Sequence, residues 1–222
     1  MITTNKNCII RLSRYKNALN RLQSLGFVKV FSENLADAVG GTSAQVRKDF
    51  SIFGISGNKR GGYQIEDLIE KLNFILGKNK VYKVILAGTG NMGSAIINYK
   101  GFEKENIQIV AGFDIDPVKY GKKIKNVPIM PLEEMGQYST ENQIKLGIIA
   151  VPEVAAQQAF DLMVASGIKG VLNFAPIRLK GPEDVTINNV NLVLELENVI
   201  YYVNVMEKEG NPSLLPKMNI GS

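Results

Sequence analysis

The sequence predicts an α/β protein with two parts: an N-terminal winged helix-turn-helix domain and a C-terminal doubly wound parallel sheet. Three observations support this prediction. Three short helical patterns are followed by a glycine-rich, basic tip. An apolar strand then runs into a G-x-G-x-x-G turn. Beyond this turn, further strands alternate with helices, as in a sheet whose strands are joined by helical crossovers.

The composition excludes several classes of protein. With 45% hydrophobic and 21% charged residues, the chain resembles an average globular protein rather than a disordered or fibrous one. Cys8 is the single cysteine and histidine is absent, which excludes an intramolecular disulfide, a Cys-cluster zinc site and hydrolases of the Ser-His-Asp or Cys-His type. We therefore expect no catalytic residue and no metal, so that any chemistry would come from a bound cofactor.

Hydropathy and charge indicate where the protein acts. The N-terminal residues carry charges where a signal peptide needs an apolar stretch, and no run of about 18 to 20 apolar residues occurs, so we expect a cytoplasmic protein without a membrane span. Residues 1–80 hold 13 Lys and Arg against 6 Asp and Glu, whereas the remainder holds 13 against 15. A basic N-terminal part joined to a mildly acidic remainder is typical of a protein with one part facing a polyanion.

Three helices are expected at the start of the chain. Residues 9–25 have apolar residues at every third or fourth position on one side. Ser32 is a typical N-cap for a second helix, which Gly40 ends. The third helix covers residues 42–53 and is closed by Gly54. A sharp turn between the second and third helices is the helix-turn-helix pattern, in which the third helix presents its polar side to the DNA major groove.

The polar side of the third helix is the expected DNA-binding surface. Its residues are Ser43, Ala44, Gln45, Arg47, Lys48 and Ser51. The basic tip at residues 57–62 lies between two short segments able to pair as strands, which is typical of a wing. Lys59 and Arg60 on this tip could reach a minor groove or phosphates. An ordinary surface hairpin is the alternative.

A fourth helix, over residues 65–77, leads to the second domain, whose glycine turn lies between a strand at 81–87 and a helix at 94–99. This is the setting of the dinucleotide-binding fingerprint of Rossmann domains. The first glycine allows a tight turn, the second allows pyrophosphate to approach backbone N–H groups, and the third lets the helix pack closely on its strand. The residues expected at the pyrophosphate are Gly88, Thr89, Gly90, Asn91, Met92 and Gly93.

The next strand, residues 107–113, ends at Asp114, which lies 21 residues after Gly93. An acid at this place accepts hydrogen bonds from the adenosine ribose hydroxyls and repels a 2′-phosphate. The expected cofactor is therefore NAD(H) and not NADP(H). A helix cap is the alternative role for Asp114.

Three further strands are expected at residues 146–151, 171–174 and 190–194, and a helix at residues 155–166. Ligands of such a sheet lie at the carboxyl ends of its strands. Pro152, Asn173 and Pro176 are therefore candidates for the nicotinamide pocket. An equally open alternative is that they are ordinary loop residues that end a strand.

The segment from Leu194 to Met206 is dense in large apolar residues. An exposed terminal helix would not carry so much apolar surface, so a partner should cover it. A second copy of the chain suits a two-fold DNA site, and packing onto the chain's own N-terminal domain is the alternative.

Taken together, TSAQVRKDFSIFG, GTGNMGSAI, AGFDIDPVKYG and GIKGVLNFAP resemble, in this order and over nearly the whole chain, the Rex family of redox-sensing transcriptional repressors. The resemblance implies a bacterial homodimer with a winged helix (residues 1–78), a Rossmann NAD(H)-binding domain (79–195) and a C-terminal dimerisation helix and tail (196–222), the helix being exchanged between subunits. Such a repressor binds A·T-rich palindromic operators when NAD+ is abundant and releases them on binding NADH.

The resemblance also assigns roles and shows departures. Tyr99 corresponds to the tyrosine that senses the nicotinamide region. Asn17 and Asn191 stand where much of the family has an Arg in the first helix and an Asp before the last one, so we expect a weaker response to NADH. In the wing, Lys59 stands where the family usually has Arg, and Arg60 replaces a Gly.

Two other functions stay open at this point. One is a nicotinamide-dependent oxidoreductase, which would need Tyr99 or a lysine as its acid or base because histidine is absent. The other is a CoA-binding module, because residues 151–176 also resemble the CoA-ligase type of Rossmann domain. Neither function would use the basic helix-turn-helix, so a repressor is the function we expect.

Overall fold

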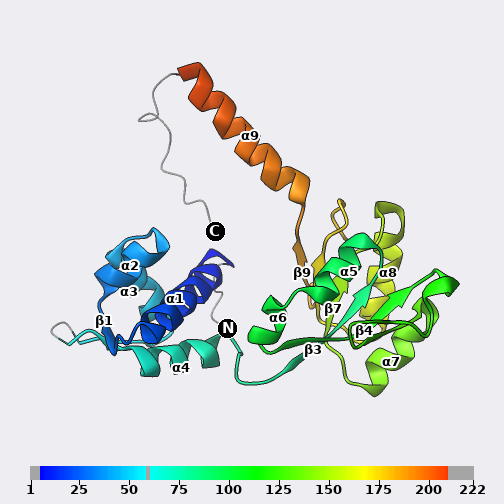
Figure 1. Ribbon diagram of the computed structural model, residues 1–222, viewed down its shortest axis with the longest axis horizontal. Coiled ribbons are helices and arrows are strands. Elements are labelled where there is room, and N and C mark those ends of the chain that lie inside the picture. The colour runs from blue at the N-terminus through cyan, green and yellow to red at the C-terminus, as the bar shows by residue number, and fades with distance from the viewer. Residues whose placement is uncertain (1–5, 59–60, 210–222) are drawn as a thin grey trace. The chain divides into compact units, whose positions relative to one another are not determined.

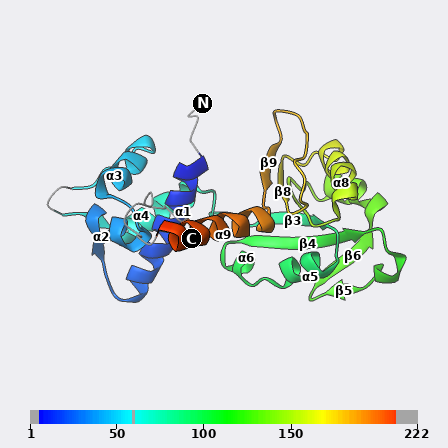
Figure 2. The same ribbon diagram turned by 90° about the horizontal axis from the view of Figure 1, so that it is seen from above.

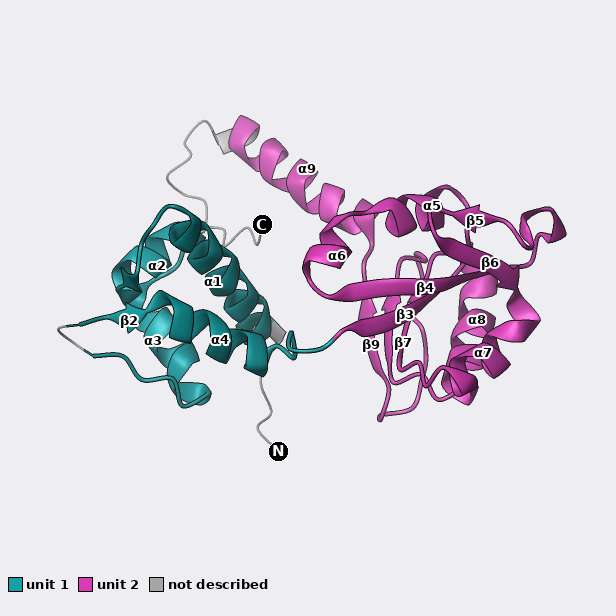
Figure 3. Cartoon of the chain, turned by 60° about the horizontal axis from the view of Figure 1, so that its bottom comes forward, with its two compact units in different colours: residues 1–80, 214–222 teal, residues 81–213 magenta. Residues whose placement is uncertain are grey.

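The computed structural model describes residues 6–58 and 61–209 (Figure 1). These residues form two compact units that divide between Lys80 and Val81, shown in different colours in Figure 3. The described residues of unit 1 lie between 6 and 80, and those of unit 2 between 81 and 209. None of the helices in these ranges is both long and apolar enough to cross a membrane.

Unit 1 contains the expected helix-turn-helix. Its helices are α1 (Lys6–Ser24), α2 (Ser32–Val39), α3 (Ser43–Ile52) and α4 (Ile65–Ile75), and its strands β1 (Lys29–Val30) and β2 (Tyr63–Gln64) pair antiparallel. Gly40 ends α2 in the left-handed conformation that glycine adopts without strain. Thr42 begins α3 as its N-cap, because its Oγ1 accepts the N–H of Gln45 at 3.2 Å.

The core of unit 1 fixes α3 against α1 and the small sheet. The ring of Phe50, on α3, meets the edge of the Tyr15 ring at a centroid distance of 5.5 Å and that of Tyr63 at 5.3 Å. Leu12 on α1 and Leu72 on α4 are fully buried in the same cluster. The polar side of α3 is therefore held in a defined direction relative to the other helices of the unit.

The expected N-cap of α2 is wrong by one residue. Phe31 is the N-cap, with extended backbone, and its N–H donates to Oδ1 of Asn34 at 3.4 Å. Ser32 is already helical, and its hydroxyl oxygen accepts a hydrogen bond from Nη1 of Arg47 at 3.0 Å. The hydroxyl thus serves a contact between α2 and α3 instead of the end of the helix.

The expected pairing of two strands around the basic tip is also wrong. The segments on either side of the tip do not pair with each other. A single antiparallel bridge joins Asn58 to Gly62 within the tip, and β2, which follows the tip, pairs with β1 instead. Lys59 and Arg60, the residues expected to reach DNA from this tip, lie outside the described residues.

Unit 2 is the expected doubly wound sheet. Its strands, in the spatial order β5-β6-β4-β3-β7-β8-β9, are parallel except for the β5–β6 pair. Their bounds are β3 (Tyr82–Ala87), β4 (Ile107–Asp114), β5 (Lys123–Ile124), β6 (Val127–Pro131), β7 (Leu146–Ile149), β8 (Gly170–Asn173) and β9 (Thr186–Asn189). The connections contain α5 (Asn91–Asn98), α6 (Gly101–Lys104), α7 (Met135–Glu141), α8 (Glu153–Ala165) and the 3₁₀ turns η1 (Pro117–Lys119) and η2 (Leu132–Glu134).

Helices cover both faces of this sheet, and α5 and α8 lie on opposite sides of it (Figure 2). Along β3, Val84 and Leu86 face the cluster that contains α5, whereas Ile85 and Ala87 face the cluster that contains α8. Burial on both faces explains the continuous apolar run of this strand. The neighbours of β3 are β4 on one side and β7 on the other, so the strand order reverses at the carboxyl ends of β3 and β7.

The strand expected at residues 190–194 is wrong. The edge strand β9 ends at Asn189, and the helix α9 (Leu192–Glu209) begins three residues later. Asn191 accounts for the difference, because its Oδ1 accepts the N–H of Val193 at 3.0 Å and that of Leu194 at 3.3 Å. An Asn that accepts from N–H groups two and three residues further on is an N-cap, so the apolar run after it starts as a helix.

Candidate functional site

The glycine turn joins β3 to α5 and leaves one side open. Gly88 has φ +90°, and a Cβ there would lie 2.5 Å from the carbonyl oxygen of Ala150. A Cβ on Gly93 would lie 1.9 Å from the oxygen of Gly88. Gly90 differs, because a Cβ there would meet no atom within 4 Å apart from those of Gly90 and its two chain neighbours. The fold itself needs Gly88 and Gly93, whereas Gly90 keeps free a space in front of the first N–H groups of α5.

Asp114, the last residue of β4, lies beside this turn. Its Oδ2 accepts the backbone N–H of Thr89 at 2.8 Å, the Thr89 hydroxyl at 2.6 Å and Nζ of Lys119 at 2.8 Å. Its Oδ1 accepts the N–H of Asp116 at 3.0 Å. The expected helix-cap alternative is wrong for Asp114, since Asp116 caps η1 by accepting the N–H of Val118 at 3.0 Å.

The donors around Asp114 keep it ionised. Burial on its own raises the pKa of this carboxyl, but the hydrogen bonds from Lys119, Thr89 and Asp116 outweigh burial and hold the pKa well below its usual range. A carboxylate at this place would repel a 2′-phosphate and accept ribose hydroxyls. Lys119 is the residue that the sequence reasoning missed here, and its position five residues after Asp114 on a Pro-initiated turn was the available signal.

The candidates for the nicotinamide pocket differ from one another. Asn173 is fully buried, and its Nδ2 donates to the carbonyl oxygens of Ala175 and Ile177 and to Oδ1 of Asn189, while its Oδ1 accepts the N–H of Ala175. Its amide atoms therefore brace the turn after β8 instead of facing a ligand. Pro152 and Pro176 are exposed and follow β7 and β8 at the carboxyl ends of these strands.

Tyr99 lies apart from the glycine turn, because it follows the last residue of α5 and the turn precedes the first. Its side chain is 61% exposed, and its ring meets the edge of the Phe102 ring at 5.2 Å. Both rings line a cavity of about 340 Å³ that is bounded by the first half of β4 (Ile107) and by Lys125. A role for Tyr99 at the nicotinamide stays a prediction that rests on the resemblance.

The second candidate site is the outer face of α3. Ala44, Arg47, Lys48 and Ser51 are exposed, and Ser43 and Gln45 are partly buried. Nη1 of Arg47 also lies 3.4 Å from Oε1 of Glu33 on α2, an exposed ion pair that DNA phosphates could replace. The six expected residues therefore lie on one side of α3, as the helical spacing predicts.

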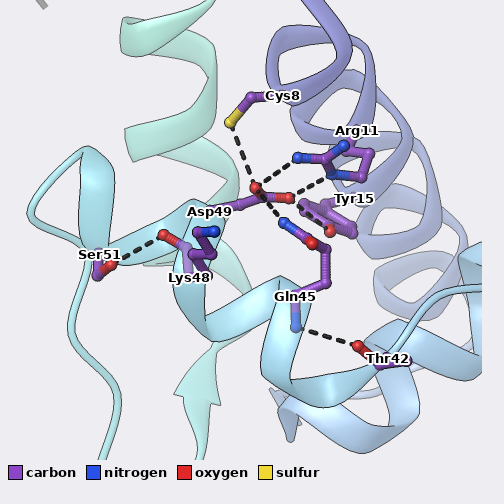
Figure 4. A network of polar contacts seen from close by, with 8 residues as sticks. All are labelled: Cys8, Arg11, Tyr15, Thr42, Gln45, Lys48, Asp49 and Ser51. Carbon is purple, nitrogen blue, oxygen red and sulfur yellow. Dashed lines mark hydrogen bonds and ion pairs between the residues drawn. The ribbon is translucent and has the colours of Figure 1, made fainter. Parts of the chain in front are cut away.

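A buried network lies behind this face (Figure 4). The Asp49 carboxylate, only 1% exposed, accepts two hydrogen bonds from Arg11, Nε to Oδ2 at 2.6 Å and Nη2 to Oδ1 at 2.7 Å. Tyr15 donates its hydroxyl to Oδ2 at 2.9 Å, and Gln45 donates Nε2 to Oδ1 at 2.8 Å. The thiol of Cys8 lies 3.4 Å from Oδ1. The network joins α1 to α3 through one carboxylate.

The charge of Asp49 is stabilised by these donors. Burial raises the pKa of Asp49, but the hydrogen bonds from Arg11, Tyr15 and Gln45 lower it by more than burial raises it. The pKa of Asp49 therefore lies below its usual range. Burial, and then the bond to Asp49, raises the pKa of the Tyr15 hydroxyl well above its usual range. Sequence reasoning missed Asp49 as a central residue. The available signal was its place among Val46, Phe50 and Phe53, on the apolar side of an amphipathic helix.

Comparisons with known proteins match both units. A family model described as the putative DNA-binding protein N-terminus matches residues 6–51, and the CoA binding domain model matches residues 79–177. The redox-sensing transcriptional repressor Rex of Desulforamulus reducens is 42% identical over 200 residues, which cover 90% of this chain and 95% of that protein. Rex of Lactobacillus acidophilus is 40% identical over 199 residues, with 90% and 94% covered.

The chain belongs to the Rex family of redox-sensing transcriptional repressors. Solved Rex-family structures agree with this assignment. The repressor RSP in complex with beta-NAD+ and operator DNA has a TM-score of 0.88 and 38% sequence identity, covering 92% of this chain and 94% of RSP. RSP in complex with beta-NADH has a TM-score of 0.83 and 38% identity, covering 93% and 97%. These Rex relatives are named as repressors and not as enzymes.

Proposed function

We propose that this Rex-family chain is a transcriptional repressor that binds A·T-rich palindromic operators through α3 and the basic tip at residues 57–62 and releases them when NADH binds unit 2. It works as a homodimer in the cytoplasm. The proposal rests above all on one combination: an ionised Asp114 beside a glycine turn with free space, in the same chain as an exposed face of α3 that carries Arg47 and Lys48.

The nucleotide part of the proposal follows from the donors and acceptors of the turn. The first N–H groups of α5 have no partners within the helix, and they stand at its positive end, which suits a pyrophosphate. Asp114 at the end of the neighbouring strand suits the ribose of NAD(H) and opposes the additional phosphate of NADP(H). Gly90, Asn91 and Met92 are exposed, which leaves this end of α5 accessible to a ligand.

The dimer is supported by α9. Large apolar residues remain exposed along this helix, namely Leu192, Val193, Leu194, Leu196, Val199, Ile200, Tyr201, Val203 and Met206. Apolar surface of this extent on one element indicates a partner surface. A second copy that exchanges the same helix would cover it and would give the two-fold symmetry that a palindromic DNA site requires.

The test is a binding assay with the full chain and a fluorescently labelled A·T-rich palindromic duplex, in which NADH and NAD+ are titrated separately. We expect NADH, and not NAD+, to lower the polarisation. Gly90→Ala should keep DNA binding but lose the response to NADH, because its methyl group occupies the free space at the turn and contacts no residue beyond its chain neighbours.

Gly136→Ala is the matched control, because it also adds one Cβ to unit 2, within α7 and away from the glycine turn, with Oγ of Ser166 as the nearest atom at 3.2 Å. This variant should respond to NADH like the wild type. Release of the Gly90→Ala variant at the wild-type NADH concentration would exclude the glycine turn as the nucleotide site.

CoA is the second candidate ligand, because the CoA binding domain model matches residues 79–177. CoA also carries a pyrophosphate, but its ribose bears a phosphate that would approach the ionised Asp114. In the same assay we therefore expect CoA to leave the duplex bound. Release by CoA at concentrations where NADH has no effect would favour the second candidate.

A further inference from the structure

We infer that Gln45 reads an adenine in the DNA major groove, and that Asp49 sets this preference by holding the Gln45 carboxamide in one orientation. The inference rests on the proposed DNA-binding function and adds to it which side chain selects which base. Gln45 is here the specificity-determining residue, and Asp49 is a positioning residue that acts through it.

The orientation of the Gln45 amide follows from the chemistry of its neighbour. An ionised carboxylate only accepts hydrogen bonds, so the amide atom that faces Asp49 at 2.8 Å must be the donor Nε2. If the amide were turned over, Oε1 would face the carboxylate, and two acceptors would repel each other. Figure 4 shows the Gln45 side chain bent toward Asp49 in this way.

Asp49 cannot follow a movement of Gln45, because it is anchored from the other side. The guanidinium of Arg11 holds both carboxylate oxygens, at 2.6 and 2.7 Å, and the Tyr15 hydroxyl adds a third bond at 2.9 Å. Both residues belong to α1, which packs on α3 through the Tyr15–Phe50 ring contact. The carboxylate is thus a fixed point, against which one N–H of Gln45 is held.

The remaining atoms of the amide match adenine. Oε1 of Gln45 accepts no hydrogen bond from the described residues, and Nε2 keeps its second N–H. In the major groove adenine presents the N6–H group as a donor and N7 as an acceptor. Oε1 of Gln45 can accept from N6–H, and the second N–H of Nε2 can donate to N7. Guanine presents two acceptors there, O6 and N7, so one of them would face Oε1.

The place of Gln45 on α3 suits this contact. It is the third residue of the helix, and in helix-turn-helix proteins the N-terminal residues of the recognition helix contact base edges. Lys48 and Ser51, further along the exposed side, are placed for phosphates or for other bases. Base selection by Gln45 therefore concerns one position in each half of a palindromic site.

The experiment selects DNA from a randomised library of 20-base-pair duplexes with the full chain and measures the base preference at every position of the enriched sequences. In the sequences enriched by the wild type, one position per half-site should show a strong preference for adenine. The variant Gln45→Ala should lose this preference. A bidentate Gln–adenine pair discriminates by about 5- to 140-fold, so the preference at this position should fall by that factor while all other positions stay unchanged.

Asp49→Asn should weaken the same adenine preference. An Asn amide has both a donor and an acceptor, so it can hydrogen-bond to the Gln45 amide in either orientation. Combined with Gln45→Ala, it should cause no further change at that position. Ile65→Val is the control for lowered stability, since Ile65 is buried in the same core on α4 and its apolar side chain takes no part in the hydrogen bonds of Asp49. This control should melt at a lower temperature with unchanged base preferences.

Gln45→Glu tests which base the side chain at position 45 selects, with a carboxylate that the ionised Asp49 repels and that therefore turns away from it. A glutamate offers only acceptors, so the preference should change from adenine to cytosine, whose N4 amino group is a donor. If Gln45→Ala and Gln45→Glu enrich the same sequences as the wild type, Gln45 does not read a base and the inference fails. If the wild type enriches no sequence at all, the proposed function itself is wrong, and the inference fails with it.

Discussion

Asp49 in unit 1 and Asp114 in unit 2 are both carboxylates inside the protein, but their donors differ. Asp49 is 1% exposed and is held by side chains of two helices, above all by Arg11. Asp114 is 8% exposed and is held by two backbone N–H groups, by Thr89 and by Lys119, whose side chain is 34% exposed. The first carboxylate joins elements, whereas the second keeps one partner that a ligand can replace.

This difference explains why two ionised groups with lowered pKa values have different uses. Every oxygen of Asp49 is enclosed by the chain, so Asp49 acts on the outside through the partly exposed Gln45 and Arg11. Asp114 lies at the end of a strand, next to the open turn at Gly90. The charged donors of the two carboxylates are similarly exposed, at 30% for Arg11 and 34% for Lys119. The space beside the carboxylate, and not its burial or the exposure of its donors, therefore distinguishes the binding carboxylate from the structural one.

The largest effect that separates the two sites is expected for Asp49→Ala. The change leaves the Arg11 guanidinium without its partner, and breaking such a buried pair costs about 3–5 kcal/mol. Because the Arg11 side chain is 30% exposed, we expect the lower end of this range. Since the chain has no tryptophan, hydrogen exchange followed by mass spectrometry is the suitable measurement, with peptides of unit 2 as the internal reference. A loss below about 1 kcal/mol in α1 and α3 would contradict a joining role.

Asp114→Ala should instead change ligand binding. Hydrogen bonds to a charged group contribute about 1.5–3 kcal/mol, so NADH affinity should fall by a factor on the order of 10 to 150. The preference for NADH over NADPH should narrow further, because Lys119 is then free to pair with a 2′-phosphate. Calorimetric titration with both nucleotides measures the two effects.

The control for Asp114→Ala is the double variant that also carries Lys119→Ala. This double variant should lose the increase in NADPH affinity that the free Lys119 gives, and its NADH affinity should stay low. Unchanged affinity of Asp114→Ala for both nucleotides would remove Asp114 from the site.

Acid should weaken the protein through both carboxylates. The folded-state pKa of Asp49 lies below that of an unfolded Asp, so the unfolded state binds more protons near pH 4. The stabilisation is complete above this pH and is lost as the pH falls through the folded-state value. Hydrogen exchange of α1 and α3 peptides between about pH 6 and 3 should show this decline in the wild type. The variant Asp49→Asn should show a flatter profile in these peptides, and an equally steep one would contradict the assignment.

The smallest effect is expected at Asn191, which also accepts two backbone N–H groups but is neutral and only partly buried. Loss of an N-cap costs about 1 kcal/mol, so Asn191→Ala should raise exchange in the first turn of α9 by roughly fivefold. Asn191→Asp should retain the cap, because Asp and Asn are equally good N-caps. Equal exchange in the Ala and Asp variants would show that α9 does not depend on its cap.

The sequence was sufficient for features that depend on neighbours along the chain. Gly88 supplies the positive φ of the turn and Gly93 packs against Gly88 and Leu86, so their spacing alone predicted the β3–α5 junction. The helix-turn-helix was predicted because Gly40 and the Thr42 cap are local signals. The glycine turn was therefore readable, although α5 begins at Asn91 and not at the expected residue 94.

Features that depend on distant residues could not be read in this way. Asp49 receives most of its hydrogen bonds from residues 34 to 41 positions earlier, and nothing in the local pattern names Arg11 as its partner. The role of Asn173 was predicted as ligand binding because it lies at the carboxyl end of a strand, but Asn189 on the neighbouring strand accepts from its amide. The short strands β5 and β6 and the helix α7 were missed, since their segments have no clear apolar period.

The apolar residues of α9 have a consequence for the amount of protein that a cell must hold. At 1.5 Å per residue, this 18-residue helix is about 27 Å long, and most of its exposed apolar positions (Leu192, Leu196, Val199, Ile200, Val203 and Met206) recur every three or four residues and form one stripe, with Leu194 and Tyr201 outside it. An apolar stripe of this length needs a partner surface along most of the helix. With the partner supplied by a second copy, the assembled fraction follows mass action. A cell that makes less of the protein would lose operator occupancy more steeply than in proportion, so gene dosage sets the working range of the sensor together with the nucleotide.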